Sequence, residues 1–133
     1  MAQYFEDHAT TFVELLTGDQ NAICHFQLFY DPKDGTKRPD LANTFVANLK
    51  QAKPTIERAA NNLQGVYVCI NETDRVGRES VNITKIRTLF ADFDNQAQPE
   101  WPIPPHFVTS RDETHGHAYW LVDDVAVDDF MYI

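Results

Sequence analysis

The apolar positions in the first half of the chain recur mostly at helical spacing, with one strand among them. A helix is predicted over 6–16, ending at Gly18. Residues 23–30 are rich in aromatic and β-branched side chains and are followed by a turn at 31–35, so they predict a strand. Two more helices are predicted on either side of Pro54, because proline interrupts a helix except near its first turn. Their apolar faces are Leu41, Phe45, Val46 and Leu49 in the first, and Ile56, Ala59, Ala60 and Leu63 in the second.

The second half of the chain alternates short apolar strands with polar loops. Ser80 is a candidate cap for a short helical segment over 82–87, and Asp128 with Asp129 would suit a further helix N-terminus. Because helices and strands are interspersed, the pattern predicts a single α+β domain over 1–133, with helices on one face of a sheet. The predicted strands are 66–70, 89–94 and 117–122, with 106–110 following a proline-rich link at 99–105.

The strand over 89–94 carries two carboxylates. Asp92 and Asp94 lie two residues apart, so their side chains share one face of the strand, while Phe93 and the other apolar residues point to the opposite face. Two carboxylates on one face can share a divalent cation. Acids are also common at a solvated strand end, so metal binding is a hypothesis at this point.

A second polar cluster follows the proline-rich link. Ser110 and Arg111 offer hydrogen-bond donors and Gly116 permits close backbone approach, so 110–116 is either a phosphate-binding loop or an ordinary hairpin loop. His117 begins a strand after this loop and is a candidate hydrogen-bond donor to a bound phosphate. Strand parity places Ala118, Trp120 and Val122 on the apolar face and leaves His115, His117 and Tyr119 on the other. Phe93, Ala118 and Trp120 are predicted to be buried.

Charge and composition narrow the class of protein. A hydrophobic content of 43% is enough for one core. The net charge of −9 is unfavourable for a nucleic-acid-binding protein unless several acids bind metal and the basic groups cluster locally. The basic positions Lys37, Arg38, Arg75 and Arg78 lie in polar loops, which are usually solvated but can also follow a nucleic-acid backbone.

The sequence contains only two cysteines, Cys24 and Cys69. Both lie in apolar runs, which predicts buried thiols in preference to a disulfide or a metal site. No apolar run approaches the ~18 residues of a membrane span, and the N-terminus lacks the features of a signal peptide. We therefore expect a cytoplasmic protein without a membrane partner.

Taken together, residues 82–94, the proline-rich link, Thr109 with Ser110, and 116–122 resemble the RepB-like plasmid and phage primases. These belong to the archaeo-eukaryotic primase, or primase-polymerase, superfamily. Residues 66–74 also resemble the strand and loop that precede the acidic motif there, so the resemblance covers about 65–122.

The resemblance implies a catalytic core of RRM-like topology, with an antiparallel sheet and helices packed on one face. It also implies two-metal nucleotidyl transfer with Mg²⁺ or Mn²⁺ in plasmid or phage DNA replication. Nucleoside triphosphates and a single-stranded DNA template are the implied partners, with a helicase domain or partner as an open addition.

By position, the resemblance implies that Asp92 and Asp94 are the catalytic, metal-binding acids. His117 would be a further catalytic residue and would bind the incoming nucleotide together with Ser110 and Arg111. The third motif of the family, an acid on a later strand, has no match here, and 130–133 supply barely one apolar turn. We therefore expect a domain truncated at its C-terminus, with no efficient catalysis by this chain alone.

Two other functions stay open. His115 and His117 could together ligate one metal in an HUH-type replication-initiator or relaxase endonuclease, in which the tyrosine that attacks the scissile phosphate would be Tyr132 or lie beyond Ile133. A catalytically inactive interaction module on the same fold is the other alternative. The unmatched third motif favours that module, whereas the retained Asp-x-Asp pair argues against it.

Overall fold

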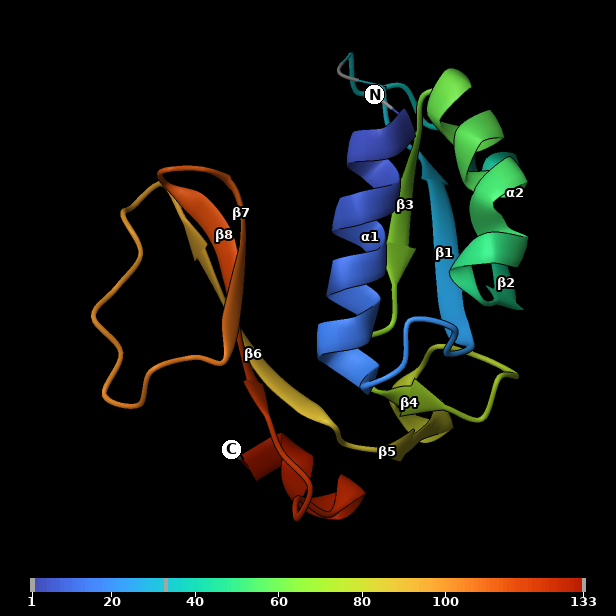
Figure 1. The fold of residues 1–133 in the computed structure, drawn as a ribbon. Helices are drawn as coiled ribbons and strands as arrows, with labels where there is room; N and C mark the ends of the chain where they lie inside the picture. Colours follow the sequence, from blue (N-terminus) through green and yellow to red (C-terminus); the bar gives the residue numbers. More distant parts are fainter. Residues whose placement is uncertain (1, 33, 133) are drawn as a thin grey trace. The chain divides into compact units, whose positions relative to one another are not determined.

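The chain has an α+β fold with antiparallel sheets, shown in Figure 1 as a computed structural model. Two compact units divide it, Met1–Thr84 and Lys85–Ile133, and the motif-bearing stretch 65–122 contributes to both. The predicted α+β class with an antiparallel sheet is confirmed, and the strands are distributed over separate sheets. The structure describes residues 2–32 and 34–132, and the side chains within 8–32 and 34–130.

The first unit contains two helices and a three-stranded sheet. Its elements are α1 (Ala2–Thr17), β1 (Cys24–Tyr30), the 3-10 helix η1 (Pro39–Leu41), β2 (Asn43–Ala47), α2 (Leu49–Asn61), β3 (Gln64–Val68), β4 (Glu72–Thr73), the 3-10 helix η2 (Ser80–Asn82) and β5 (Ile83–Lys85). The sheet order is β2-β1-β3, with both pairings antiparallel, while β4 and β5 pair separately. The helix predicted over 6–16 and the strands predicted over 23–30 and 66–70 are confirmed as α1, β1 and β3.

The core of this unit lies between β1 and the two helices, which cover the same face of the sheet (Figure 1). Val13 of α1 and Ile56 of α2 both pack against Cys24 and Phe26 of β1. Phe45 of β2 adds a stacked ring 5.0 Å from that of Phe26. Apolar burial on this single face therefore fixes the two helices to the sheet.

The helix predicted around Phe45 is wrong, because Asn43–Ala47 forms the strand β2. Phe45 lies directly opposite Phe26 in the β1–β2 register, so cross-strand packing outweighs the helical spacing of the apolar residues. Asn48 and Gln51 then form a reciprocal capping box that begins α2 at Leu49. The strand and the cap together exclude a helix across this segment.

The prediction that Pro54 separates two helices is wrong, because Pro54 lies inside α2. Its side chain is exposed, so the one backbone hydrogen bond that proline cannot donate is lost on the solvent side. The helical segment predicted over 82–87 is also wrong, because Ile83–Lys85 is the strand β5. Ser80 is the first residue of η2 and does not cap it; the N-cap position belongs to Glu79.

The second unit contains a three-stranded antiparallel sheet. Its elements are β6 (Thr88–Asp94), β7 (Phe107–Asp112), β8 (His115–Leu121) and the 3-10 helix η3 (Val127–Tyr132). The order is β6-β8-β7, so β8 is the central strand. The predicted strands over 89–94, 106–110 and 117–122 are thus confirmed. Asp128 and Asp129, which were predicted at a helix N-terminus, lie in the first turn of η3. Ile133 falls outside the described residues.

The buried face of the second sheet follows the predicted parity at two positions out of three. Phe93 and Ala118 are buried, but Trp120 is only half-buried. The Trp120 ring packs edge-on against Trp101 at 5.1 Å, and its indole Nε1 donates to the carbonyl oxygen of Ile103 at 2.9 Å. Trp120 therefore anchors the proline-rich link through both its ring and its indole N–H.

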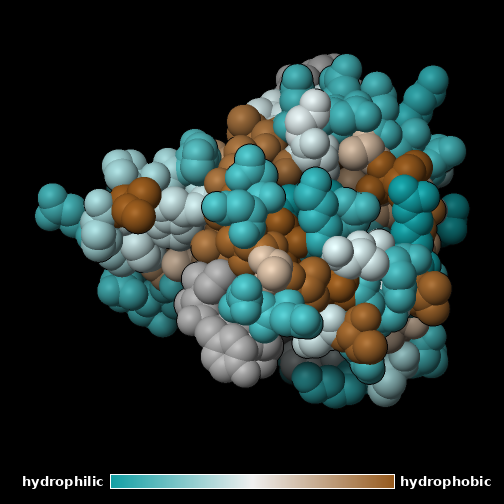
Figure 2. Space-filling model, turned by 90° about the horizontal axis from the view of Figure 1, so that it is seen from below, coloured by the Kyte–Doolittle hydropathy of each residue, from teal (hydrophilic) through white to brown (hydrophobic). Residues whose placement is uncertain are grey.

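Both cysteines are thiols in the structure; Cys24 is buried, and Cys69 is partly buried. Among the described residues, no helix has the length and apolar content needed to cross a bilayer. Hydrophobic and hydrophilic side chains are interspersed on the face drawn in Figure 2. Val76 and Val81 are the most exposed of the large apolar side chains described.

Candidate active site

The pairing of β6 with β8 sets the candidate site. Asp92 and Asp94 are exposed on one face of β6, and β8 places His117 opposite Asp92 and His115 opposite Asp94. Nε2 of His117 lies 3.2 Å from Oδ1 of Asp92. The structure therefore brings together the two acids and the histidine that the sequence places on one face.

The edge strand β7 closes the other side of the site. Thr109 lies opposite His117 in the register, whereas Ser110 lies opposite Gly116, whose position belongs to the other face of β8. Thr109 is therefore the hydroxyl residue registered beside His117, and Ser110 borders the same hollow from its edge. The hollow has a volume of about 400 Å³ and is lined by Asp92, Asp94, Thr109, Ser110, Arg111, His115, Gly116 and His117.

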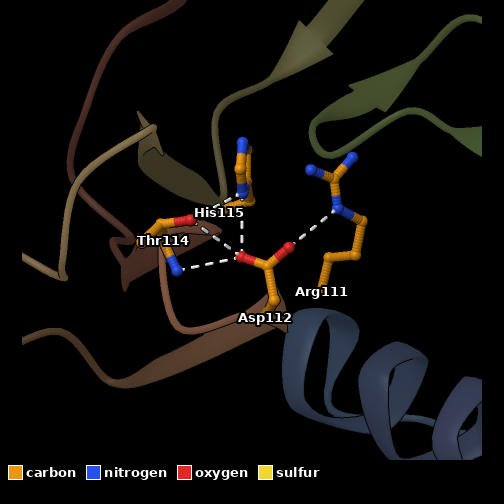
Figure 3. A network of polar contacts seen from close by, with 4 residues as sticks. All are labelled: Arg111, Asp112, Thr114 and His115. Atoms are coloured by element: carbon orange, nitrogen blue, oxygen red, sulfur yellow. Dashed lines mark hydrogen bonds and ion pairs between the residues drawn. The ribbon is translucent and has the colours of Figure 1, made fainter.

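The turn between β7 and β8 is fixed by Asp112 (Figure 3). Its Oδ1 lies 2.8 Å from Nδ1 of His115 and accepts from the backbone N–H of Thr114 at 2.9 Å, while Oδ2 accepts from Nε of Arg111 at 3.3 Å. Hydrogen bonds from His115 and then from Thr114 hold the pKa of Asp112 far below its ordinary value. Asp112 thus engages Nδ1 of His115, so that Nε2 is the ring nitrogen left for a ligand.

A β-bulge accompanies this turn, because the β7–β8 register shifts between Ser110 and Asp112. Such a bulge re-aims the side chains beside it. Arg111 follows at the rim of the hollow, where its side chain is 72% exposed. The guanidinium is therefore available to a ligand at the cost of only one long hydrogen bond to Asp112.

Tyr119 is a site residue to which the sequence assigned no role. It shares the face of His117, and its hydroxyl lies 3.3 Å from Nδ1 of His117. Its ring stacks on Phe107 at 4.7 Å, and burial raises the pKa of its phenol. The arrangement fits the tautomer in which Tyr119 donates to Nδ1 and Nε2–H of His117 donates to Asp92. The signal in the sequence is the two-residue spacing of His117 and Tyr119 on a strand.

Gly116 allows close packing within the sheet, a role that the sequence did not show. A Cβ at this position would lie 2.5 Å from the carbonyl oxygen of Thr109 and 2.6 Å from the ring of Phe93. The close approach that glycine permits is therefore to β7 and to the buried face of the sheet. This differs from the predicted approach to a phosphate.

The candidate basic residues outside this site belong to the first unit. Arg78 is not a solvated loop residue, because its Nε donates to Sγ of Cys69 at 3.0 Å and its Nη1 to Oε1 of Gln27 at 3.1 Å. Arg38 forms a two-bond ion pair with Asp40, with its Nη2 2.7 Å from Oδ2. Arg78 therefore tethers the loop before β5 to β1, and Arg38 lies beside an exposed carboxylate.

The donor set at the site suits one kind of metal ion. Within the part of the chain that the structure describes, no three His, Cys, Asp or Glu side chains are grouped to hold a metal by themselves. Mg²⁺ commonly binds through one or two carboxylates, several waters and the phosphates of a substrate. The two exposed carboxylates Asp92 and Asp94 fit that mode, in which a nucleotide completes the coordination.

Comparison of the chain with protein-family models, with curated proteins and with solved structures gives no significant match. The geometry of the site and the resemblance of its motifs therefore carry the argument about function.

Proposed function

We propose that this chain carries the metal- and nucleotide-binding site of a primase-type nucleotidyltransferase acting in plasmid or phage DNA replication. The observation that carries the proposal is the convergence of Asp92, Asp94 and His117 on one hollow, with Arg111 at its rim. Carboxylates for a divalent cation and donors for phosphate oxygens are the groups that a nucleoside triphosphate requires. The volume of about 400 Å³ lies within the range of small-molecule sites.

The proposed roles follow from the positions of the side chains. Asp92 and Asp94 hold Mg²⁺ or Mn²⁺, which when bound neutralises charge on the phosphates and the leaving group. His117 is oriented by Tyr119, so its Nε2–H can exchange the carboxylate of Asp92 for a phosphate oxygen. Arg111 contacts the outer phosphates from the rim, and the Ser110 hydroxyl is a further hydrogen-bond donor at the edge of the hollow.

The first experiment measures metal and nucleotide binding together. NMR signals of the second unit are expected to broaden when Mn²⁺ is added with a nucleoside triphosphate, and far less with Mn²⁺ alone, because two carboxylates leave most of the coordination to water and phosphate. The Asp92→Asn/Asp94→Asn variant is expected to lose the effect. Its matched control is Asp123→Asn/Asp124→Asn, a neighbouring pair of exposed acids in the same unit. Equal broadening in both variants would contradict the proposed site.

The second experiment measures catalysis on a single-stranded DNA template with Mn²⁺. Any primer synthesis by this chain, or by a longer protein that contains it, is expected to fall by about a hundredfold or more in Asp92→Asn, since nucleotidyl transfer depends on the metal that this acid holds. Primer synthesis that survives in both Asp92→Asn and Asp94→Asn would contradict the assignment of these two acids as metal ligands.

The endonuclease alternative is favoured by one specific contact. Asp112 binds Nδ1 of His115, and a carboxylate that holds one ring nitrogen is typical of a histidine whose other nitrogen ligates a metal. In that case His115→Ala would abolish Mn²⁺ binding, and the double Asn variant would retain it. If neither metal nor nucleotide bound the wild-type chain, the inactive interaction module would become the leading hypothesis.

A further inference from the structure

The first unit exposes a pair of aromatic rings on the sheet face opposite its two helices. Phe29 of β1 and Tyr67 of β3 are each 46% exposed, and their rings meet edge to face at 5.7 Å. Both lie on the face of the sheet opposite to Phe26 and the helices, because the register pairs Gln27 with Tyr67. The rings therefore stand outside the core of the unit.

The rest of this face of β1 is covered. Nδ1 of His25 lies 2.9 Å from Oγ1 of Thr73, and Arg78 reaches over to donate to Gln27. Phe29 is the next residue in the same row, and it is half-exposed where His25 and Gln27 are buried. The cover thus ends at the point where the aromatic pair begins.

The absence of a side chain at position 65 lets the Tyr67 ring lie close to the backbone of β3. Gly65 lies opposite Phe29 in the register, and a Cβ on it would lie 2.9 Å from the ring of Tyr67. The Tyr67 ring therefore lies over the backbone of its own strand. A planar ligand could stack on rings held in this way.

Basic side chains border the same rings. A hollow of about 430 Å³ is lined by Phe29, Tyr30 and Tyr67 on the sheet side, and by Lys37 and Arg38 on the loop side. Arg38 is paired with the exposed Asp40, and Lys37 is exposed. Asp31 is the acidic residue in the lining, and Asp40 already pairs with Arg38, so a phosphate would replace Asp40 at that guanidinium.

We propose that this surface binds a segment of single-stranded nucleic acid, with separate bases stacked on the exposed faces of the Phe29 and Tyr67 rings and the adjoining phosphates beside Lys37 and Arg38. Exposed aromatic rings on adjacent strands with cations at their border are the recurring chemistry of single-strand binding, because every base has a π face and every linkage a phosphate. Lys37 can pair with a phosphate, and Arg38 can do so in exchange for Asp40, which favours this occupant over an apolar partner. The role as a template site rests on the proposed function, whereas the binding itself is independent of it.

The test uses the full chain and a fluorescein-labelled oligothymidylate of about ten nucleotides, a length within the site sizes of single-strand binders. Fluorescence anisotropy at low salt measures the affinity. Phe29→Leu and Tyr67→Leu retain apolar bulk but lose the π face, and each is expected to weaken binding about tenfold. The matched control is Val81→Ala, which removes an exposed apolar side chain of the same unit outside the hollow.

The cations are tested separately by salt dependence. Lys37→Gln and Arg38→Gln are surface substitutions, and each is expected to reduce the slope of log affinity against log salt by about 0.7 if its side chain contacts a phosphate. Far-ultraviolet circular dichroism shows whether each variant keeps the wild-type fold. These two variants keep the test decisive even if a leucine variant failed to fold.

The inference is overturned if wild type does not bind the oligonucleotide, or if the leucine and glutamine variants bind it as wild type does. Concentration-dependent dimerisation that is lost in Tyr67→Leu, without oligonucleotide binding, would also overturn it in favour of a second copy of the chain. Asp92→Asn/Asp94→Asn separates the two proposals. Loss of nucleotide binding with retained oligonucleotide binding supports both, and oligonucleotide binding without any metal or nucleotide binding by wild type refutes the proposed function alone.

Discussion

The sheets β2-β1-β3 and β6-β8-β7 are both antiparallel and three-stranded, but their central strands differ in what they expose. In β1, Cys24–Leu28 are buried on both faces, and exposure begins at Phe29. In β8, burial is confined to Ala118 and Tyr119, and His117 is exposed beside the acids. The first sheet is thus held by apolar packing, whereas the register of the second sheet positions polar groups.

The difference indicates where each unit is sensitive to substitution. Removing a buried ring from β1, which is covered on both faces, lowers stability, because the surrounding core cannot close the cavity. Changing a residue that sets the register of β8 alters the geometry of the site, because a small displacement separates His117 from Asp92 of β6 and from Thr109 of β7.

Phe26→Ala is expected to have the largest effect, a loss of about 3–5 kcal/mol in the free energy of unfolding of the first unit. Phe26 is buried in the core cluster and stacks on Phe45. Circular dichroism of the helices reports the first unit, which contains both α1 and α2, whereas tryptophan fluorescence reports the second, which contains Trp101 and Trp120. The helical transition should move to lower denaturant. An equal shift of the fluorescence transition would show that the two units unfold together.

Gly116→Ala is expected to destabilise the second unit by about 1–3 kcal/mol, because the new Cβ would meet the backbone oxygen of Thr109. Gly65→Ala is the matched substitution in the first unit, and there the obstacle is the Tyr67 side chain, which can rotate away. Its cost should stay below about 1 kcal/mol. Denaturant unfolding by the two signals above measures both values. A larger cost for Gly65→Ala would reverse the contrast between the sheets.

Strand parity is the part of the site that the sequence could predict. Asp92, Asp94 and His117 share a face because alternation along a strand is set by backbone geometry alone. Contacts across the turn were not predictable in this way. Asp112 reaches His115 because a bulge shifts the register, and nothing in the local sequence pattern specifies that bulge.

The fold shows the same division between local and long-range signals. α1, β1 and β3 follow from their apolar spacing, and the capping box of Asn48 with Gln51 was present in the sequence as an unused start signal for α2. β2 was missed because Phe45 and Val46 fit a helical face as well as a strand. Its state is decided by pairing with β1, which lies far away along the chain.

His25 should make the first unit sensitive to mild acid. Burial lowers its pKa, the charge of Arg78 lowers it further, and Asp74 partly offsets them. An unfolded histidine titrates near pH 6.5, so below that pH the unfolded state binds more protons and the folded state loses stability. His25→Gln should remove this dependence between about pH 7.5 and about pH 5. The control is His8→Gln in α1, where the side chain is exposed, and an unchanged pH dependence in His25→Gln would contradict the prediction.

Asp112→Asn should have the smallest effect, because the Asp112 side chain is about half exposed. The folded pKa of Asp112 is depressed, so its contribution is present above the ordinary pKa of about 3.9 and is lost as the pH falls through the folded value. Hydrogen exchange at the Thr114 amide, which donates to Asp112, is the measurement, with Glu113→Gln as the neighbouring control. Exchange in Asp112→Asn should be faster than in wild type at pH ~6 and should approach wild type only well below pH ~3.9. Equal exchange at both pH values would mean that the turn is held by its backbone alone, so that the second sheet needs no charge to aim His115.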